Sequence, residues 1–109
     1  MTPRRSSLPE QTHNQLKAQI LAYLQQCGAF PIPVNSGAWK VGNRYVKFSV
    51  PGCSDILCCW QGKFVAVEIK VKRDALRDSQ IQFLDHVRHA GGVVIVARTL
   101  EDVIAAKPA

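Results

Sequence analysis

The sequence predicts an α/β domain with a mixed four-stranded sheet flanked by helices, in the order helix, three strands, helix, strand, helix. The chain has 109 residues, of which 47% are hydrophobic, and this size fits one core rather than two domains. Apolar residues recur at helical spacing in some segments and form alternating or continuous runs in others. A helix that connects the last two strands makes those strands parallel, because such a connection crosses over the sheet.

The first helix follows a short polar segment. Residues 1–11 contain Arg4, Arg5 and prolines, so we expect a flexible basic arm before a single domain over residues 12–109. The stretch Thr12 to Gln15 matches the capping box S/T-x-x-E/Q, which predicts a helix start. Gly28 predicts the helix end, and five residues recur before it at helical spacing: Leu16, Ile20, Tyr23, Leu24 and Cys27.

The central part of the chain carries the first three predicted strands. Proline, glycine and asparagine residues from Phe30 to Asn43 predict a long loop with at most a short extended piece. Alternation from Tyr45 to Val50 predicts a strand that ends at Pro51-Gly52. Two further apolar runs, Asp55 to Trp60 and Phe64 to Val71, predict a hairpin.

The last part of the chain predicts a helix, a strand and a second helix. The first of these helices covers Arg77 to Ala90 and stops at Gly91-Gly92. The run from Val93 to Ala97 is continuously apolar, which is typical of a buried parallel strand. Leu100 to Ala106 predicts a short final helix.

Three charged residues interrupt the predicted hairpin. With Gln61-Gly62 as the two turn residues, Asp55 lies opposite Glu68. Lys70 shares the strand face of Glu68, because side chains alternate along a strand. A turn at Gly62-Lys63 would instead place Asp55 opposite Lys70, still on that face, whereas a three-residue loop without a bulge would break the arrangement.

Opposed carboxylates repel each other, so Asp55 and Glu68 require a compensating cation. Lys70 is one candidate, and a bound metal is another. Carboxylate oxygens from neighbouring strands suit Mg²⁺ or Mn²⁺, which keep several waters and also bind phosphate oxygens. A nearby lysine can stabilise charge on that phosphate, so these groups suit phosphodiester hydrolysis. The alternative is a solvent-facing hairpin held by salt bridges.

Gln80 helps to distinguish a functional site from a solvent-facing hairpin. It lies on the apolar stripe of the second helix, which consists of Leu76, Phe83, Leu84 and Val87. A polar amide on a buried stripe needs hydrogen-bond partners. Either other core groups or a functional site would supply them.

Net charge and cysteine content indicate which partners the protein can have and in which cellular compartment it is expected. Fourteen Lys and Arg against eight Asp and Glu give a net charge of +6, which suits a polyanion such as nucleic acid. No apolar run approaches the roughly 20 residues of a membrane span, so we expect no membrane partner and a cytoplasmic location. The four cysteines contain no CxxC pair and are expected to be reduced, with Cys58 and Cys59 on opposite strand faces.

The ordered motifs resemble a known nuclease family. They are Gly52-Cys-Ser-Asp55-Ile56, Phe64-Val-Ala-Val-Glu68-Ile-Lys70, Ser79-Gln80, Phe83-Leu84 and Gly91-Gly92-Val-Val-Ile-Val-Ala97. Over about residues 15–105 they resemble the VRR-NUC (virus-type replication-repair nuclease) branch of the PD-(D/E)XK nucleases. Two positions depart from the family pattern. Ser54 replaces the usual proline, and Gln15 stands where the first helix commonly carries a glutamate, so Gln15 is either a weaker metal ligand or only the N3 residue of the capping box.

The resemblance implies a restriction-endonuclease-like core that uses Mg²⁺ or Mn²⁺. It also implies a homodimer that cleaves branched DNA such as Holliday junctions. Asp55 and Glu68 would bind the metal together with the backbone carbonyl of Ile69. Lys70 would assist the attacking water, and Gln80 would support the site from its helix.

Two groups of residues are expected to contact DNA. Lys72, Arg73 and Arg77 follow the acidic site, and the preceding loop region carries Trp39, Lys40, Arg44 and Lys47. The basic residues would contact phosphates, with Trp39 stacking on an unpaired base, although each charge alone is also common on a surface. Two other functions stay open: a non-catalytic nucleic-acid-binding module, and an interaction subunit of a larger repair or replication complex.

Overall fold

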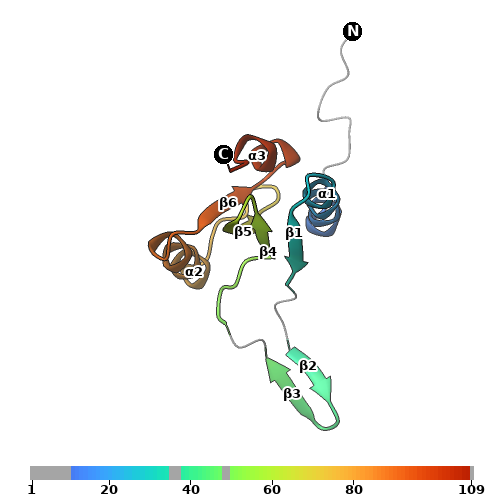
Figure 1. Ribbon diagram of the computed structural model, residues 1–109. Helices are drawn as coiled ribbons and strands as arrows, with labels where there is room; N and C mark the ends of the chain where they lie inside the picture. Colours follow the sequence, from blue (N-terminus) through green and yellow to red (C-terminus); the bar gives the residue numbers. More distant parts are fainter. Residues whose placement is uncertain (1–10, 35–37, 48–49, 109) are drawn as a thin grey trace.

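A mixed four-stranded sheet forms the centre of the computed structural model, which describes residues 11–34, 38–47 and 50–108 (Figure 1). The strand order is β1-β4-β5-β6, with antiparallel pairing except between β5 and β6, which run parallel. The α/β class and the parallel crossover are therefore confirmed. The strands of this sheet are β1 (Phe30–Pro33), β4 (Ile56–Trp60), β5 (Lys63–Ile69) and β6 (Val93–Ala97).

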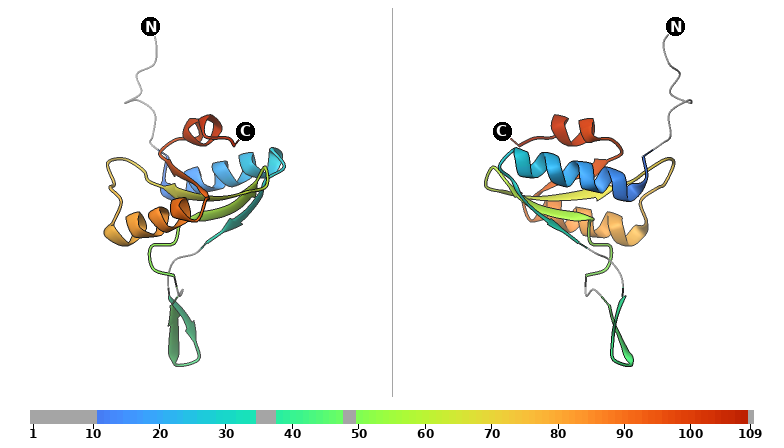
Figure 2. Two further views of the ribbon diagram at one scale, coloured as in Figure 1. Left: turned by 60° about the vertical axis from the view of Figure 1, so that its left-hand side comes forward. Right: turned by 90° about the vertical axis from the view of Figure 1, so that its right-hand side faces the viewer.

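Three helices cover the two faces of the sheet (Figure 2). Helices α1 (His13–Gln26) and α3 (Leu100–Ala105) share one apolar core with one face, and α2 (Asp78–His89) packs on the other. These three helices lie where the sequence predicts them. Of the residues described, none forms a helix with the length and apolar character that crossing a membrane requires.

The β4–β5 hairpin has the predicted register. Gln61 and Gly62 both have positive φ, at 55° and 74°, as expected for the two central residues of a type I′ turn. Trp60 consequently pairs with Lys63, and the ladder runs back to Ile56. The next residue before that last pair is Asp55, so the turn fixes where the acidic residue emerges from the sheet.

The first strand of the sheet differs from the prediction. Residues 30–33, expected within a loop, form β1 and pair with β4. Pro31 and Pro33 lack backbone N–H groups, but β1 is an edge strand, where a missing donor on the outer side is tolerated. The prolines that predicted a loop are therefore compatible with an edge position.

The strand expected over Tyr45 to Val50 belongs to a separate hairpin. Strand β3 (Arg44–Lys47) pairs with β2 (Ala38–Val41) in a two-stranded sheet of its own. Gly42 and Asn43 form the turn between these strands, so the chain satisfies the backbone of β3 locally. In both figures this hairpin stands apart from the four-stranded sheet (Figures 1 and 2).

Candidate active site

Asp55 is held at the start of β4 by three contacts. Its backbone carbonyl accepts a 2.8 Å hydrogen bond from the Val34 N–H. Its carboxylate Oδ2 accepts a 2.8 Å hydrogen bond from the Ile69 N–H, at the end of β5. On the other oxygen, Oδ1, the His13 Nε2 atom of α1 lies 3.2 Å away. Asp55 thus connects β1, β5 and α1 at one end of the sheet.

Glu68 is a buried carboxyl group in β5. Only 2% of the residue is exposed, and its Oε2 atom is buried without a hydrogen-bond partner among the described residues. Burial, followed by the nearby Asp55 carboxylate, raises the pKa of Glu68 to about 7. The positive charge of Lys70 opposes this rise in the pKa. Asp55 and Glu68 therefore form the close acidic pair that the sequence predicts.

Gln80 supports this pair from the first turn of α2. Its Nε2 donates a 2.8 Å hydrogen bond to Glu68 Oε1. Its Oε1 accepts a 2.9 Å hydrogen bond from the Arg77 N–H, at the N-cap of the same helix. The two bonds use opposite ends of the amide, so they fix which end faces the carboxyl group. The prediction that this amide has hydrogen-bond partners is confirmed.

Gly52 brings α2 close to the segment that leads into Asp55. Its φ is +70°, and a Cβ at this position would collide with the backbone of Ser79 and lie 2.7 Å from the Gln80 nitrogen. Only glycine fits both the backbone conformation and the close approach. The glycine therefore sets the distance between the Asp55 segment and the helix that carries Gln80.

Lys70 lies one residue beyond β5 and is 7% exposed. Its backbone N–H donates a 3.0 Å hydrogen bond to the Ala97 carbonyl, which anchors it to β6. Because its charge acts on Glu68, the lysine belongs to the acidic site rather than to the outer surface. The structure thus brings together Asp55, Glu68, Ile69, Lys70 and Gln80.

The first helix contributes a different residue from the one considered in the sequence. Gln15 is exposed, and its Oε1 accepts a 2.8 Å hydrogen bond from the Thr12 N–H, while the Thr12 hydroxyl accepts from the Gln15 N–H. The capping-box interpretation is confirmed. His13 reaches Asp55 instead. The sequence places His13 one turn before the buried Leu16, but nothing in it identifies Asp55 as the partner of this histidine.

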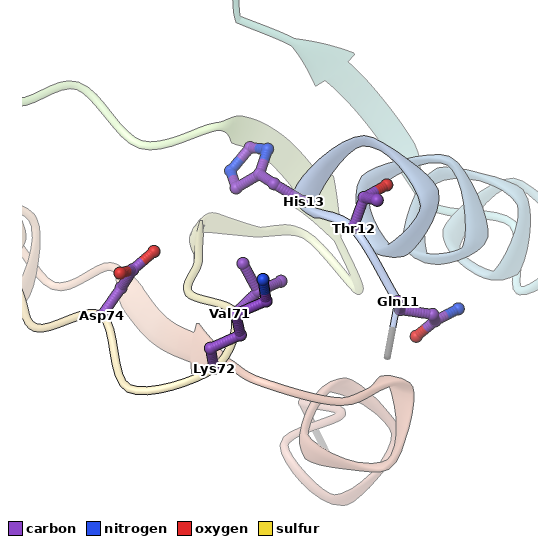
Figure 3. A pocket seen from close by; sticks show the side chains of 6 residues that line it. All are labelled: Gln11, Thr12, His13, Val71, Lys72 and Asp74. Atoms are coloured by element: carbon purple, nitrogen blue, oxygen red, sulfur yellow. The ribbon is translucent and has the colours of Figure 1, made fainter. Parts of the chain in front are cut away.

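A cavity of about 600 Å³ adjoins the site beside His13 (Figure 3). The start of α1 forms one wall, and Val71, Lys72 and Asp74 form the other. Arg98 holds that second wall: its guanidinium donates to the carbonyls of Lys72 at 3.0 Å and Asp74 at 2.7 Å. No sequence pattern indicates this role for Arg98. The predicted DNA contacts Lys72, Arg73 and Arg77 are all exposed on this segment or at the following N-cap.

The other predicted DNA contacts lie in the β2–β3 hairpin. The backbone register pairs Trp39 with Val46, Lys40 with Tyr45, and Val41 with Arg44. Lys47 pairs with Ala38 at the open end. The structure gathers the four predicted contacts in one hairpin, which stands apart from the four-stranded sheet (Figure 1).

The donor set at the site suits a hard divalent cation. Across residues 11–34, 38–47 and 50–108, no group of three or more His, Cys, Asp or Glu side chains is arranged to hold a metal. Asp55 and Glu68 supply two carboxylates, and Ile69 adds a backbone carbonyl nearby. Mg²⁺ usually takes one or two carboxylates and keeps several waters, so this small oxygen set fits it. The unpaired, buried Glu68 Oε2 is the atom that most needs such a partner.

The fold and the acidic pair can be compared with those of known α/β domains. A solved structure described as a VRR_NUC domain matches the chain with a TM-score of 0.62 and 16% sequence identity, over 85% of this chain and 90% of that one. The chain therefore has the fold of a VRR-NUC domain. No family model matches the sequence, and no curated protein matches it.

Proposed function

We propose that the protein is a metal-dependent DNA endonuclease that hydrolyses phosphodiester bonds in branched DNA. The observation that carries this proposal is the convergence of Asp55, Glu68 and Lys70 at one end of the sheet, with Gln80 bonded to Glu68. A solvent-facing salt-bridged hairpin would leave these groups exposed. Instead, Glu68 and Lys70 are 2% and 7% exposed, and a buried carboxyl group with a raised pKa beside a second carboxylate is typical of a functional site.

Asp55 and Glu68 would hold Mg²⁺ or Mn²⁺, with the Ile69 carbonyl as a third oxygen donor. The cation would polarise a phosphate oxygen and lower the pKa of water. Before it binds, His13 and the Ile69 N–H occupy the two Asp55 oxygens, which keeps the carboxylate in place. Gln80 does the same for Glu68 from the other side of the pair.

Lys70 would act on the charge that develops during hydrolysis. Only 7% of Lys70 is exposed, and a fixed charge in a buried position stabilises an anion more strongly than one in solution. In the role expected from the resemblance, it orients the attacking water and stabilises negative charge on the phosphate. Lys70 would thus contribute to catalysis, whereas Asp55 and Glu68 alone would only bind the cation.

The distribution of charge supports DNA as the substrate. Lys72 lines the cavity next to His13, the exposed Arg73 follows it in the chain, and Arg77 is the N-cap residue of α2, bonded to Gln80. Cations in this position would hold phosphates on either side of the bond that is cut. The β2–β3 hairpin, which carries Trp39 and further basic residues, would contact DNA away from the cut. The preference for branched DNA is the one that the resemblance to VRR-NUC nucleases implies.

Purified protein incubated with Mg²⁺ or Mn²⁺ and a panel of flap, fork, four-way junction and linear duplex DNAs tests the proposal. We expect cleavage that requires the cation and favours a branched substrate. Uncut DNA throughout would contradict the catalytic proposal. Tight, salt-dependent binding without cleavage would favour a non-catalytic binding module, and neither binding nor cleavage would favour an interaction subunit. The homodimer expected from the sequence stays a prediction in this proposal.

A further inference from the structure

A turn with an unusual backbone conformation follows the acidic site. In residues 71–74, the Asp74 N–H donates a 3.2 Å hydrogen bond to the Val71 carbonyl. Lys72, the first central residue of this turn, has a φ of +56°. Turns with a positive φ at this position favour glycine, asparagine or aspartate, because other side chains crowd the backbone there. A lysine thus occupies a position that glycine would fill with less strain.

Strand pairing does not account for the conformation of Lys72. Among the described residues, the other non-glycine residue with a positive φ is Gln61, at 55°, and the two-residue turn between β4 and β5 requires that conformation. Lys72 lies outside the ladder, since β5 ends at Ile69. Strained residues that their surroundings hold in place cluster at functional sites. The side chain of Lys72 is therefore expected to have a role that glycine could not fill.

Arg98 holds the turn in this conformation. Its Nη1 donates a 3.0 Å hydrogen bond to the Lys72 carbonyl, and its Nη2 donates a 2.7 Å bond to the Asp74 carbonyl. A guanidinium can bind two acceptors at once because its donors form a rigid planar fork. The Arg98 backbone is itself fixed, since its N–H donates a 2.9 Å hydrogen bond to Asp102 Oδ2 on α3. Arg98 thus connects the segment between β6 and α3 to the turn.

The same end of β6 anchors Lys70. The Lys70 N–H donates a 3.0 Å hydrogen bond to the carbonyl of Ala97, which is the last residue of β6 and directly precedes Arg98. The backbone of Lys70 is therefore held by a main-chain bond, and that of Lys72 by the Arg98 side chain. Together these bonds fix the backbone of the second lysine relative to that of the first.

Lys72 lines the cavity of about 600 Å³ that adjoins the acidic pair. This volume lies within the range of about 300–1,000 Å³ that is usual for ligand sites. His13 lines the cavity and also lies 3.2 Å from Asp55 Oδ1, so a single side chain separates the cavity from the acidic pair. In Figure 3 the Lys72 side chain extends toward the start of α1, whereas the Asp74 side chain lies further from that helix. Among the described residues Lys72 forms no ion pair, so its ammonium group is available to an anion.

We propose that this cavity binds the part of the DNA strand next to the phosphate that is cut, with Lys72 as the phosphate ligand and Arg98 as the positioning residue that directs Lys72. The inference rests on the proposed nuclease function and assigns a subsite to it. Arg98 uses its donors on two backbone carbonyls, so it acts through Lys72 and not on the phosphate itself. Because phosphate contacts carry no sequence information, the subsite accepts any base.

The salt dependence of DNA binding tests the subsite. Fluorescence anisotropy of a labelled four-way junction, without divalent cation so that the DNA stays intact, gives the affinity at several KCl concentrations. Loss of one phosphate contact reduces the salt slope by about 0.9 and weakens binding by about tenfold. We expect both changes in Lys72→Ala and the same two changes in Arg98→Ala. A merely structural loss in Arg98→Ala would leave the slope of the folded protein unchanged and would overturn the proposal.

The double variant of Lys72→Ala with Arg98→Ala separates positioning from direct contact. If Arg98 acts through Lys72, the double variant binds DNA as Lys72→Ala does, because the same contact is lost only once. Additive losses would mean that Arg98 binds a phosphate itself and would overturn its positioning role. Arg88→Ala is the control, because it also removes an exposed arginine, one that is bonded to Asp85 on α2, and it should bind as the wild type does.

Arg98→Lys tests whether the planar fork matters. This variant keeps the positive charge but cannot bind both carbonyls in the same way. We expect it to lose affinity as Arg98→Ala does, and wild-type affinity would overturn the proposal. Circular dichroism checks that each variant is folded; if Arg98→Ala is not, Arg98→Lys decides.

Cleavage of the same junction separates this inference from the proposed nuclease function. We expect Arg98→Ala to require about tenfold more protein for half-maximal cleavage, with an unchanged rate at saturation, because the contact is equal in the ground state and the transition state. A wild type that cuts, with Arg98 variants that bind DNA equally tightly, would overturn this inference alone. If the wild type binds without cutting, the nuclease function fails and the binding comparison still decides the roles of Arg98 and Lys72. A wild type that neither binds nor cuts would overturn both.

Discussion

Gln80 Nε2 donates a 2.8 Å hydrogen bond to Glu68 Oε1 and so connects helix α2 directly to the acidic pair. The same amide accepts from the Arg77 N–H at 2.9 Å, so one side chain both caps the helix and positions a carboxyl group. Its orientation therefore depends on the helix start. This couples the end of a secondary-structure element to the geometry of the site.

Gln80→Ala should weaken both the fold and the activity. The substitution leaves the Glu68 Oε1 atom buried and without its donor, which costs about 1–3 kcal/mol of unfolding free energy. We also expect DNA cleavage to fall by about tenfold or more, since a barrier increase of 1.4 kcal/mol has that effect. Urea unfolding and single-turnover cleavage measure the two quantities. Gln82→Ala, on the exposed surface of the same helix, is the control and should change neither.

Glu68→Gln should make the protein more stable at neutral pH while abolishing cleavage. Folding raises the pKa of Glu68 from 4.5 to about 7, so between these values the folded chain binds more protons than the unfolded chain. The unfolding free energy therefore falls as the pH rises from 4.5 to 7, by on the order of 3 kcal/mol. The unfolding free energy of the glutamine variant does not fall in this way, because an amide does not ionise.

Urea unfolding below pH 4.5 and above pH 7 gives the comparison. We expect the variant and the wild type to differ little in unfolding free energy at the lower pH and the variant to be more stable at the higher one. Glu101→Gln, at an exposed position of α3, should show no such change with pH. An equal difference at both pH values would mean that burial does not oppose ionisation of Glu68.

The register of the β4–β5 hairpin and the core of the acidic site can be predicted from the amino-acid sequence alone. A two-residue turn fixes the register of β4 and β5, and this register places Asp55 beside Glu68, so their proximity follows from the residues of the hairpin. Gln80 can be assigned because an amide on an apolar helix stripe must find a partner. These predictions succeed because they depend on local geometry and on the cost of burying polar groups.

Features that depend on long-range packing do not follow from the sequence in this way. The two prolines of β1 argue against a strand, and only its place at the sheet edge makes them acceptable. The strand at Arg44 is expected in the main sheet because alternation does not identify a partner, which is β2. The contact between His13 and Asp55 joins residues 42 positions apart, and a helix-start histidine alone does not indicate it.

His13→Ala should reduce cleavage with little effect on stability. The substitution removes the group that lies 3.2 Å from Asp55 Oδ1, so only the Ile69 N–H would orient this carboxylate. Because His13 is 40% exposed, we expect a loss of unfolding free energy below about 1 kcal/mol. We expect single-turnover cleavage to slow by about tenfold, which corresponds to 1.4 kcal/mol. Asn14→Ala, next to it on the exposed side of α1, should behave as the wild type; equal rates in all three proteins would exclude a role for His13.

Gly52→Ala and Gly62→Ala separate the effect of close packing from that of backbone conformation. Both glycines have a similar positive φ, at +70° and +74°. A Cβ at Gly52 would collide with Ser79, whereas nothing lies within 4 Å of one at Gly62. We expect Gly62→Ala to cost about 1 kcal/mol of unfolding free energy for the left-handed conformation, and Gly52→Ala about 1–3 kcal/mol more for overpacking. Thermal unfolding compares the two, and equal losses would mean that α2 does not pack on Gly52 as the structure indicates.

The most direct test of the central claim compares cleavage and DNA binding in Lys70→Ala and Asp55→Asn. Both variants, with the wild type and the exposed control Lys107→Ala, are incubated with Mg²⁺ or Mn²⁺ and the branched DNA that the wild type cuts best. We predict that the two site variants still bind this DNA but lose cleavage by a factor of about 100 or more, as expected for groups that act on the transition state, and that Lys107→Ala cuts normally. Full cation-dependent cleavage by both site variants would contradict the assignment of this acidic pair and its lysine as the active site.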